Sequence, residues 1–283
     1  EVGTREPLFL DVCYALRNHK DIKFIGGRYG LSSKDTNPSH INAVFEELKK
    51  DAPKEEFTIG IEDDVTNLSI SPIDIHVDAD YTSCLFYGLG SDGTVGANKS
   101  TVKIIGNNTD LYSQAYFAYD SKKAGGVTRS HLRFGPTPIH SPYYINKADF
   151  ISCSQESYAF KFDMVRDLKE GGTFLLNTVI PAEEIENRLP NRMLKALADK
   201  KANFYIINAN AIARETHMGS HTNTILQSAF FKLNEQIMPY SKSLALMEAS
   251  ARSTYARKGE DVVNNNIAAI NKGSEGLVKV EVK

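Results

Sequence analysis

Short apolar runs alternate along most of this chain with segments in which apolar residues recur every three or four positions. The first pattern predicts buried β-strands, and the second predicts amphipathic helices. The predicted strands are 84–87, 112–119, 127–134, 150–153, 174–177 and 204–207. The predicted helices between them are 95–106, 157–169, 181–188 and 191–201. This alternation indicates a three-layer α/β/α domain, a sheet covered by helices on both faces.

The two ends of the chain depart from this pattern. Residues 223–237, 241–257 and 261–273 predict three helices, so the C-terminal part is helical. The first 72 residues predict only helices at 8–18 and 38–50, strands at 22–25 and 57–61, and a polar glycine loop at 26–35. These elements are too few for a stable α/β domain, and we interpret them as the end of a truncated one.

A stretch with the composition of a linker separates the two parts. Residues 69–81 contain Pro72 and a run of acidic side chains, and strands and helices alternate from residue 82 onward. The predicted organisation is therefore a partial domain at 1–72, a linker at 73–81 and an α/β domain at 82–283.

Composition limits the kind of protein. The 283 residues carry 33 basic and 35 acidic side chains, a net charge of −2, so nothing suggests non-specific nucleic-acid binding. No apolar run approaches the roughly 18 residues of a membrane span. The three cysteines, Cys13, Cys84 and Cys153, lie far apart, and each is predicted to be reduced and buried. An iron–sulfur cluster needs about four cysteines, so none is predicted within this segment.

Four glycines follow the strand predicted at 84–87, at positions 88, 90, 93 and 96, and a helical pattern follows them. Glycine lets the backbone approach a phosphate, and free N–H groups at a helix N-terminus donate to its oxygens. Ser91 and Thr94 add hydroxyl donors, and Lys99 adds a positive charge. Tight turns also use glycine for steric reasons alone, but the flanking strand and helix favour a phosphate site.

A second loop of similar character joins the strands predicted at 112–119 and 127–134. Its sequence is Asp-Ser-Lys-Lys-Ala-Gly-Gly, at positions 120–126. The lysines and glycines suit a phosphate, although a solvated hairpin turn has the same composition. Ligands of open α/β sheets bind at the carboxyl ends of strands, where both loops are predicted to lie.

Both loops and several further motifs resemble the pyruvate:ferredoxin (flavodoxin) oxidoreductase family. The motifs are Gly-Leu-Gly-Ser-Asp-Gly-Thr-Val-Gly-Ala-Asn-Lys (88–99), Ala-Tyr-Asp-Ser-Lys-Lys-Ala-Gly-Gly-Val (118–127), His-Leu-Arg-Phe-Gly (131–135), Gly-Gly-Arg-Tyr-Gly-Leu-Ser-Ser-Lys-Asp (26–35), Phe-Thr-Ile-Gly-Ile-Glu-Asp-Asp-Val (57–65) and Val-Lys-Val-Glu-Val (278–282). They are long and ungapped, and the resemblance covers essentially the whole chain. The family enzymes are far larger. This chain resembles the end of their transketolase-C-terminal-like second domain, followed by their whole gamma-type third domain.

The resemblance implies a biochemical setting. Such enzymes join pyruvate to thiamine diphosphate, release carbon dioxide, transfer the acetyl group to coenzyme A, and pass electrons through [4Fe-4S] clusters to ferredoxin or flavodoxin. It implies that the third domain binds coenzyme A, and that thiamine diphosphate, Mg and the clusters belong to other domains of a full-length homodimer. The location implied is the cytoplasm, or a hydrogenosome-like organelle in some anaerobic eukaryotes. The isolated segment is expected to be inactive.

The resemblance also assigns site residues. It places coenzyme A contacts at Ser91, Asp92, Gly93, Thr94, Val95, Lys123, Asn223 and Asn266. An asparagine beside a helix start is commonly only an N-cap, and the neighbouring Asn264 and Asn265 leave the register of the last contact open. The resemblance implies no catalytic residue and no metal ligand in this segment.

Two other interpretations stay open. A dinucleotide-binding dehydrogenase domain would use the glycines at 88–93 and a ribose-binding Asp120. However, Asp120 lies 30 residues beyond Gly90, whereas the usual spacing is about 20. In the third interpretation the chain is a structural module, and its glycine loops only form turns and contacts between domains.

Overall fold

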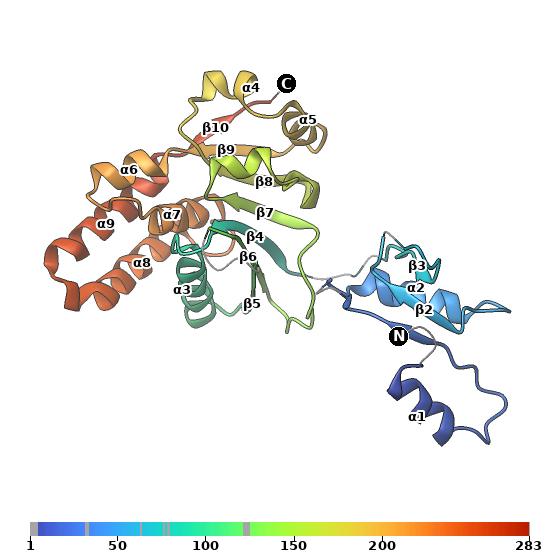
Figure 1. Ribbon diagram of the computed structural model, residues 1–283. Helices are drawn as coiled ribbons and strands as arrows, with labels where there is room; N and C mark the ends of the chain where they lie inside the picture. Colours follow the sequence, from blue (N-terminus) through green and yellow to red (C-terminus); the bar gives the residue numbers. More distant parts are fainter. Residues whose placement is uncertain are drawn as a thin grey trace. The chain divides into compact units, whose positions relative to one another are not determined.

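The computed structural model describes residues 5–31, 34–62, 64–75, 77, 80–120 and 125–282. The chain divides into two compact units, one of residues 1–79 with 141–144 and the other of residues 80–140 with 145–283. The larger unit contains the sheet and helices that position the predicted anion site (Figure 1).

The larger unit is built on a seven-stranded sheet of order β10-β9-β8-β7-β4-β6-β5. Its strands are β4 (Thr82–Leu89), β5 (Tyr112–Tyr119), β6 (Val127–Gly135), β7 (Ala148–Cys153), β8 (Leu168–Asn177), β9 (Asn203–Ile207) and β10 (Val278–Val280). Strands β4, β7, β8 and β9 are parallel neighbours, whereas β6 is antiparallel to both β4 and β5. Strands β4 and β5 therefore point the same way and end at the same edge of the sheet.

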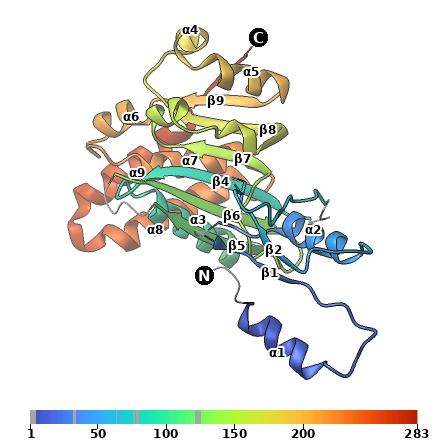
Figure 2. The ribbon, with the colours of Figure 1, turned by 45° about the vertical axis from the view of Figure 1, so that its right-hand side comes forward.

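Helices cover both faces of this sheet, which confirms the predicted three-layer α/β/α architecture. One face carries α3 (Thr94–Asn108), α6 (Ala209–Glu215), α7 (Asn223–Leu233), α8 (Tyr240–Tyr255) and α9 (Glu260–Glu275). The other carries α4 (Ile185–Arg188) and α5 (Asn191–Asp199). Figures 1 and 2 show α3, α7, α8 and α9 grouped together. Among the described residues, no helix has the length and apolar character that a bilayer crossing needs.

Alternate residues of β4 supply the two cores because successive strand side chains face opposite sides of a sheet. Phe86 points into the core beneath α7, where its ring centroid lies 5.4 Å from that of Phe230. Phe150 of β7 also lies 5.2 Å from Phe230, which makes this residue of α7 the centre of an aromatic cluster. Leu85 and Tyr87 belong to the opposite core.

The smaller unit holds a three-stranded parallel sheet of β1 (Gly26–Arg28), β2 (Glu56–Ile59) and β3 (Ser69–Ile70). Its helices are α1 (Pro7–Ala15) and α2 (Pro38–Leu48). Asn37 is the N-cap of α2: it accepts a hydrogen bond from the N–H of His40, whose ring accepts one from Asn37 N–H.

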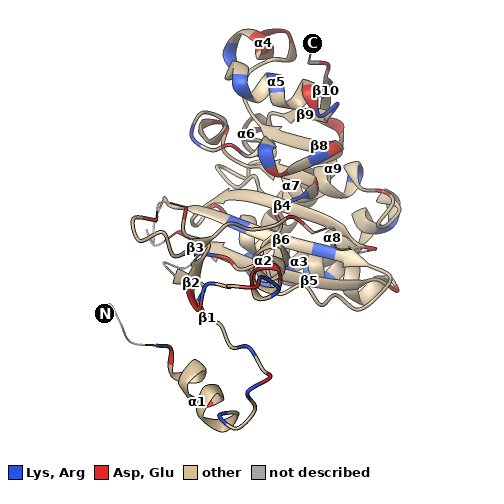
Figure 3. Ribbon diagram, turned by 90° about the vertical axis from the view of Figure 1, so that its right-hand side faces the viewer, with Lys and Arg blue, Asp and Glu red and all other residues tan. Residues whose placement is uncertain are grey.

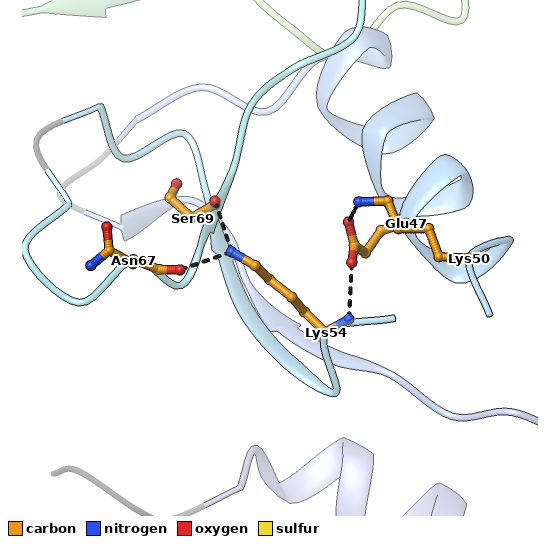
Figure 4. A network of polar contacts seen from close by, with 5 residues as sticks. All are labelled: Glu47, Lys50, Lys54, Asn67 and Ser69. Atoms are coloured by element: carbon orange, nitrogen blue, oxygen red, sulfur yellow. Dashed lines mark hydrogen bonds and ion pairs between the residues drawn. The ribbon is translucent and has the colours of Figure 1, made fainter. Parts of the chain in front are cut away.

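Polar contacts tie the C-terminal end of α2 to the segment before β2 and to β3 (Figure 4). The carboxylate of Glu47, 4% exposed, accepts from Lys50 Nζ at 2.6 Å and from Lys54 N at 2.9 Å. Lys54 Nζ in turn donates to the carbonyl oxygens of Asn67 at 2.8 Å and Ser69 at 3.5 Å. These bonds satisfy a carboxylate that would otherwise be costly to bury.

The structure corrects one prediction in the smaller unit. In place of the strand expected at 22–25, strand β1 follows directly after it and includes two glycines that we assigned to a polar loop. Glycine is needed there because an added Cβ would lie 2.7 Å from the ring of Phe9 at Gly26 and 2.1 Å from that of Phe57 at Gly27. Residues 69 and 70, which precede the linker expected at 73–81, pair with β2 as strand β3, which was not predicted.

A further correction concerns the helix expected at 157–169. The segment forms two 3₁₀ helices, η2 (Glu156–Phe160) and η3 (Val165–Asp167), and β8 begins directly after them. Gly171 and Gly172 lie inside β8 and do not end a helix. The helix expected at 181–188 begins as a 3₁₀ turn, η4 (Ala182–Glu184), before α4, and α8 ends in another, η5 (Ala256–Lys258). The other elements predicted after residue 81 are confirmed, whereas α6 and β10 were not predicted.

Candidate functional site

The glycine loop lies where β4 ends and α3 begins, at the carboxyl edge of the sheet. Gly93 is the N-cap of α3 and has φ +88°, a left-handed conformation that favours glycine. Ser91, which is exposed, also has a positive φ of +78°. Gly88 permits a close approach, because an added Cβ would lie 2.7 Å from Thr94 Cβ. The loop is thus folded back tightly against the first residue of α3.

Asp92 holds this loop in shape. Its Oδ2 accepts hydrogen bonds from Leu89 N and from the hydroxyl of Ser154, and its Oδ1 accepts one from Thr94 N, each 2.8 Å long. The carboxylate therefore joins the end of β4, the start of α3 and the residue that follows β7. The carboxylate is directed into the loop and is fully engaged there. This explains how an acidic residue can lie beside a predicted anion site.

The first turn of α3 presents backbone donors. An α-helix has no carbonyls of its own for its first N–H groups, and here Asp92 satisfies only that of Thr94. The N–H groups of Val95 and Gly96 belong to the same turn, and no side chain in the described part of the structure caps them. An added Cβ at Gly96 would meet no atom within 4 Å, so the backbone there is accessible. Such a turn attracts an anion through its N–H groups and the helix dipole.

The second loop adjoins the first. Gly90 N donates to Gly126 O at 2.9 Å, and Asp120 N donates to Val127 O at 3.1 Å, so the β5–β6 hairpin closes beside the glycine loop. Lys123, predicted to contact the ligand, lies outside the described residues, as do 121, 122 and 124. Lys99 does not face the loop: its Nζ lies 5.4 Å from the ring centroid of Phe117 on β5.

Asn223 joins the loop from a distant part of the sequence. It is the first residue of α7, and an added Cβ at Gly93 would lie 2.9 Å from Asn223 Cγ. The N-termini of α3 and α7 therefore converge on one point. The structure thus brings Asn223 together with the predicted residues 91–95.

Asn266 lies elsewhere. Its buried side chain donates to Val262 O of its own helix, α9, at 2.8 Å. Helix α9 runs antiparallel to α7, because an added Cβ at Gly273 would touch Ile225 O while Ser228 Oγ donates to Ile270 O. Asn266 is seven residues before Gly273, which is about 10 Å along the helix axis, toward the far end of α7.

A pocket extends from the glycine loop into the protein between β4, α3 and α7. Its lining residues are Phe86, Tyr87, Thr94, Ala97, Asn98, Thr101, Ser152, Ser154, Asn223, Leu226, Gln227 and Phe230. Sequence reasoning missed Asn98, Gln227 and the two serines. One signal was present: polar residues at 94, 98 and 101 repeat with helical spacing on the buried side of α3.

Burial shifts the pKa of three side chains on strands β4, β6 and β7. Burial raises the pKa of Tyr87 to about 12, and burial also raises the pKa of Cys153 to about 12. Burial, with the positive charges of Arg129 and Arg133, lowers the pKa of His131 to about 3. Among the described residues no group of three His, Cys, Asp or Glu side chains could hold a metal ion. What the site offers is hydrogen-bond donors and helix dipoles, which suit binding of an anion.

The distribution of charged side chains does not mark this site. Figure 3 shows Lys and Arg interspersed with Asp and Glu. Several of them pair locally, as Arg188 does with Glu184 and Lys195 with Asp199. In the described part of the loop, attraction for an anion therefore comes from backbone groups.

Comparison with known proteins identifies the family of this chain. Residues 83–276 match the family described as pyruvate ferredoxin/flavodoxin oxidoreductase, a match of more than half of the chain. The chain belongs to this family. The family resemblance inferred from the motifs is confirmed.

Two curated relatives cover nearly the whole chain. The pyruvate-flavodoxin oxidoreductase of Enterobacter agglomerans is 50% identical and the pyruvate:ferredoxin oxidoreductase of Moorella thermoacetica is 48% identical, each over 98% of this chain. The chain spans only 24% of the length of either relative. It therefore corresponds to about a quarter of a pyruvate-flavodoxin oxidoreductase.

Two solved structures share the fold of most of this chain. The pyruvate oxidoreductase subunit PORC of Thermotoga maritima has a TM-score of 0.57 at 19% identity and covers 72% of this chain and 100% of its own. The 2-oxoglutarate:ferredoxin oxidoreductase of Magnetococcus marinus, solved with 2-oxoglutarate, coenzyme A and succinyl-CoA bound, has a TM-score of 0.52 at 16% identity. It covers 72% of this chain and 32% of its own.

Proposed function

We propose that this chain is the coenzyme A-binding region of an enzyme that decarboxylates pyruvate oxidatively to acetyl-CoA and passes the electrons to ferredoxin or a similar acceptor. The observation that carries the proposal is the convergence of the α3 and α7 N-termini at Gly93 and Asn223. Coenzyme A has a pyrophosphate and a 3′-phosphate, and two helix N-termini suit such a group. The structure from Magnetococcus marinus, solved with coenzyme A bound, supports the same ligand class.

The contacts we propose fall into two groups. Ser91, Gly93 and Val95 offer backbone N–H groups to the pyrophosphate, and Ser91 and Thr94 offer their hydroxyls, while Asp92 accepts from Thr94 N and keeps the loop in shape. The second group is Lys123 of the second loop, Asn223 of α7, and Asn266 or one of its two neighbours on α9. Asn223 lies beside Gly93, at the pyrophosphate, and Asn266 lies toward the far end of α7, so this second group extends along the ligand from the pyrophosphate.

We propose that thiamine diphosphate, Mg and the [4Fe-4S] clusters belong to the remaining domains of the parent enzyme. The residues of this chain do not fit a cluster, which takes about four cysteine thiolates. The chain has three cysteines, and burial raises the pKa of both Cys84 and Cys153. The purified chain should therefore give neither carbon dioxide nor reduced acceptor from pyruvate and coenzyme A. We further propose a full-length homodimer located in the cytoplasm.

The dehydrogenase interpretation is not favoured by the sheet order. In a dinucleotide-binding domain the ribose-binding acid ends the strand next to the one that carries the glycine loop. Here β6 separates β4 from β5, whose end carries Asp120. The acid is therefore two strands away from the glycine loop.

Calorimetric titration of the chain with coenzyme A and with NAD tests the proposal. Thr94→Ala removes a buried hydroxyl of the loop and should weaken coenzyme A binding by about 1.5–3 kcal/mol, the value for a hydrogen bond to a charged group. Thr94→Ser keeps the hydroxyl and should retain most of the affinity. If Thr94→Ala binds coenzyme A as tightly as the unchanged chain, the loop is only a turn.

A further inference from the structure

We propose that Asn98 is a ligand residue: its side-chain amide donates a hydrogen bond to a phosphoryl oxygen that enters the pocket behind the glycine loop. This inference rests on the proposed coenzyme A site and extends it inward from the loop surface. It is carried by an unpartnered buried donor, by the polar walls around it and by the two helix N-termini at the mouth of the pocket.

The amide of Asn98 lacks an acceptor. The residue is 4% exposed and lines the pocket, and its Nδ2 has no hydrogen-bond partner within the described part of the chain. Native proteins leave few buried donors unpaired, because each one loses its water without gaining an acceptor. A group that enters the pocket from outside would supply the acceptor.

The polar side chains next to Asn98 do have hydrogen-bond partners. Gln227 Nε2 donates to Ala97 O at 3.2 Å and to Thr101 Oγ1 at 3.0 Å, and Thr101 Oγ1 donates to Ala97 O at 3.0 Å. These bonds join α3 to α7 and form a fixed wall. Asn98, on the same helix, takes no part in this network. The wall holds α3 in place while leaving the Asn98 donor available.

The surroundings favour a negatively charged acceptor. Among the described residues, no carboxylate lines the pocket, and the nearby Asp92 is engaged with Leu89, Thr94 and Ser154. Thr94 and Asn223, the first residues of α3 and α7, both line the pocket, so the positive ends of two helix dipoles face it. A phosphoryl oxygen meets both requirements, since it accepts hydrogen bonds and carries negative charge.

The test compares Asn98→Leu with a control at the other end of the same helix. Asn108→Leu replaces the same residue type at the last position of α3, where the amide donates to Ile104 O. Binding of coenzyme A and of inorganic pyrophosphate is measured by calorimetry, and the melting temperature is measured without ligand. Asn98→Leu should weaken coenzyme A binding about tenfold or more, while Asn108→Leu should leave it unchanged.

The melting temperature of the ligand-free protein distinguishes an asparagine that binds a ligand from one that stabilises the fold. Because Asn98→Leu removes an unpaired buried donor, its melting temperature without ligand should equal or exceed that of the unchanged chain. Asn98→Asp keeps the size of the side chain but presents a negative charge, so its loss of affinity should be larger still. This second variant keeps the test valid if leucine is not accommodated.

The outcomes separate the inference from the proposed function. If coenzyme A binds and the Asn98 variants bind it as tightly as the unchanged chain, the pocket holds water at most and the inference is overturned, while the coenzyme A site stands. If only pyrophosphate binds, and binds through Asn98, the pocket stands and the proposed function fails. If the unchanged chain binds neither probe, both are overturned.

Discussion

The side chain of Asn223 lies against Gly93, so closely that a Cβ at position 93 would be 2.9 Å from Asn223 Cγ. This contact joins the first turn of α7 to the N-cap of α3. It requires a residue without a side chain and with a left-handed backbone at position 93, and only glycine meets both conditions without strain.

Gly93→Ala should therefore lower both stability and affinity. The left-handed conformation costs an L-residue about 1–2 kcal/mol, and the new methyl group would displace the Asn223 side chain from the site. Gly96→Ala is the matched control, because its added Cβ meets open space in the same helix. It should raise the free energy of unfolding by about 0.5–1 kcal/mol. Urea unfolding measures the free energy of unfolding of both variants. Equal effects of the two substitutions would contradict the role given to the contact between Gly93 and Asn223.

Asp92→Ala should loosen the glycine loop. The change leaves Leu89 N, Thr94 N and the Ser154 hydroxyl without their acceptor, and an unpaired buried donor costs about 1–3 kcal/mol. Hydrogen exchange should show faster exchange of the Leu89 and Thr94 amides. Asp110→Ala, at an exposed position, should change the free energy of unfolding by less than about 0.5 kcal/mol. Unchanged exchange at Leu89 and Thr94 would show that Asp92 does not hold the loop.

Stability should fall as the pH falls below about 6.5, in part because of His131. Its folded-state pKa is about 3, whereas the ordinary value is 6.5. Between these values the unfolded chain binds a proton that the folded chain does not, so the free energy of unfolding decreases as the pH falls, by up to about 1.4 kcal/mol per pH unit. This contribution is complete above the unfolded pKa.

Replacing His131 tests this dependence. His131→Gln should reduce the pH dependence of urea unfolding by up to one proton between about pH 7.5 and about pH 5.5. His140→Gln, at an exposed position, is the control for the replacement of a histidine by glutamine. An identical pH dependence in the unchanged chain and His131→Gln would show that His131 titrates normally in the folded protein.

Lys123→Ala should weaken coenzyme A binding and make it less dependent on ionic strength, because one screened charge pair is lost. In an extended segment successive side chains face opposite sides, so Lys122→Ala should be nearly neutral with the same change in net charge. The apparent Michaelis constant for coenzyme A in the full-length enzyme, at saturating pyruvate, measures both. Equal effects would indicate general electrostatics, and a larger effect at Lys122 would mean that the register is shifted by one residue.

Local patterns determined much of this protein from the sequence alone. The apolar run of β4, the four glycines and the following helix were all predicted, because each depends on residues adjacent in the chain. Asn37 and Pro38 likewise marked the start of α2 through interactions within one helical turn. The motifs around these elements were sufficient to recognise the family.

Tertiary structure decided which residues meet. The contact of Asn223 with Gly93, the pocket in which Asn98 is buried, and the position of β6 between β4 and β5 all join segments that are distant in the chain. The same reason explains the errors at Gly26 and Gly27, since a glycine pair predicts a loop until the rings of Phe9 and Phe57 are placed beside it. Sequence periodicity reports which face of an element is buried, whereas the partner across that face depends on how the whole chain packs.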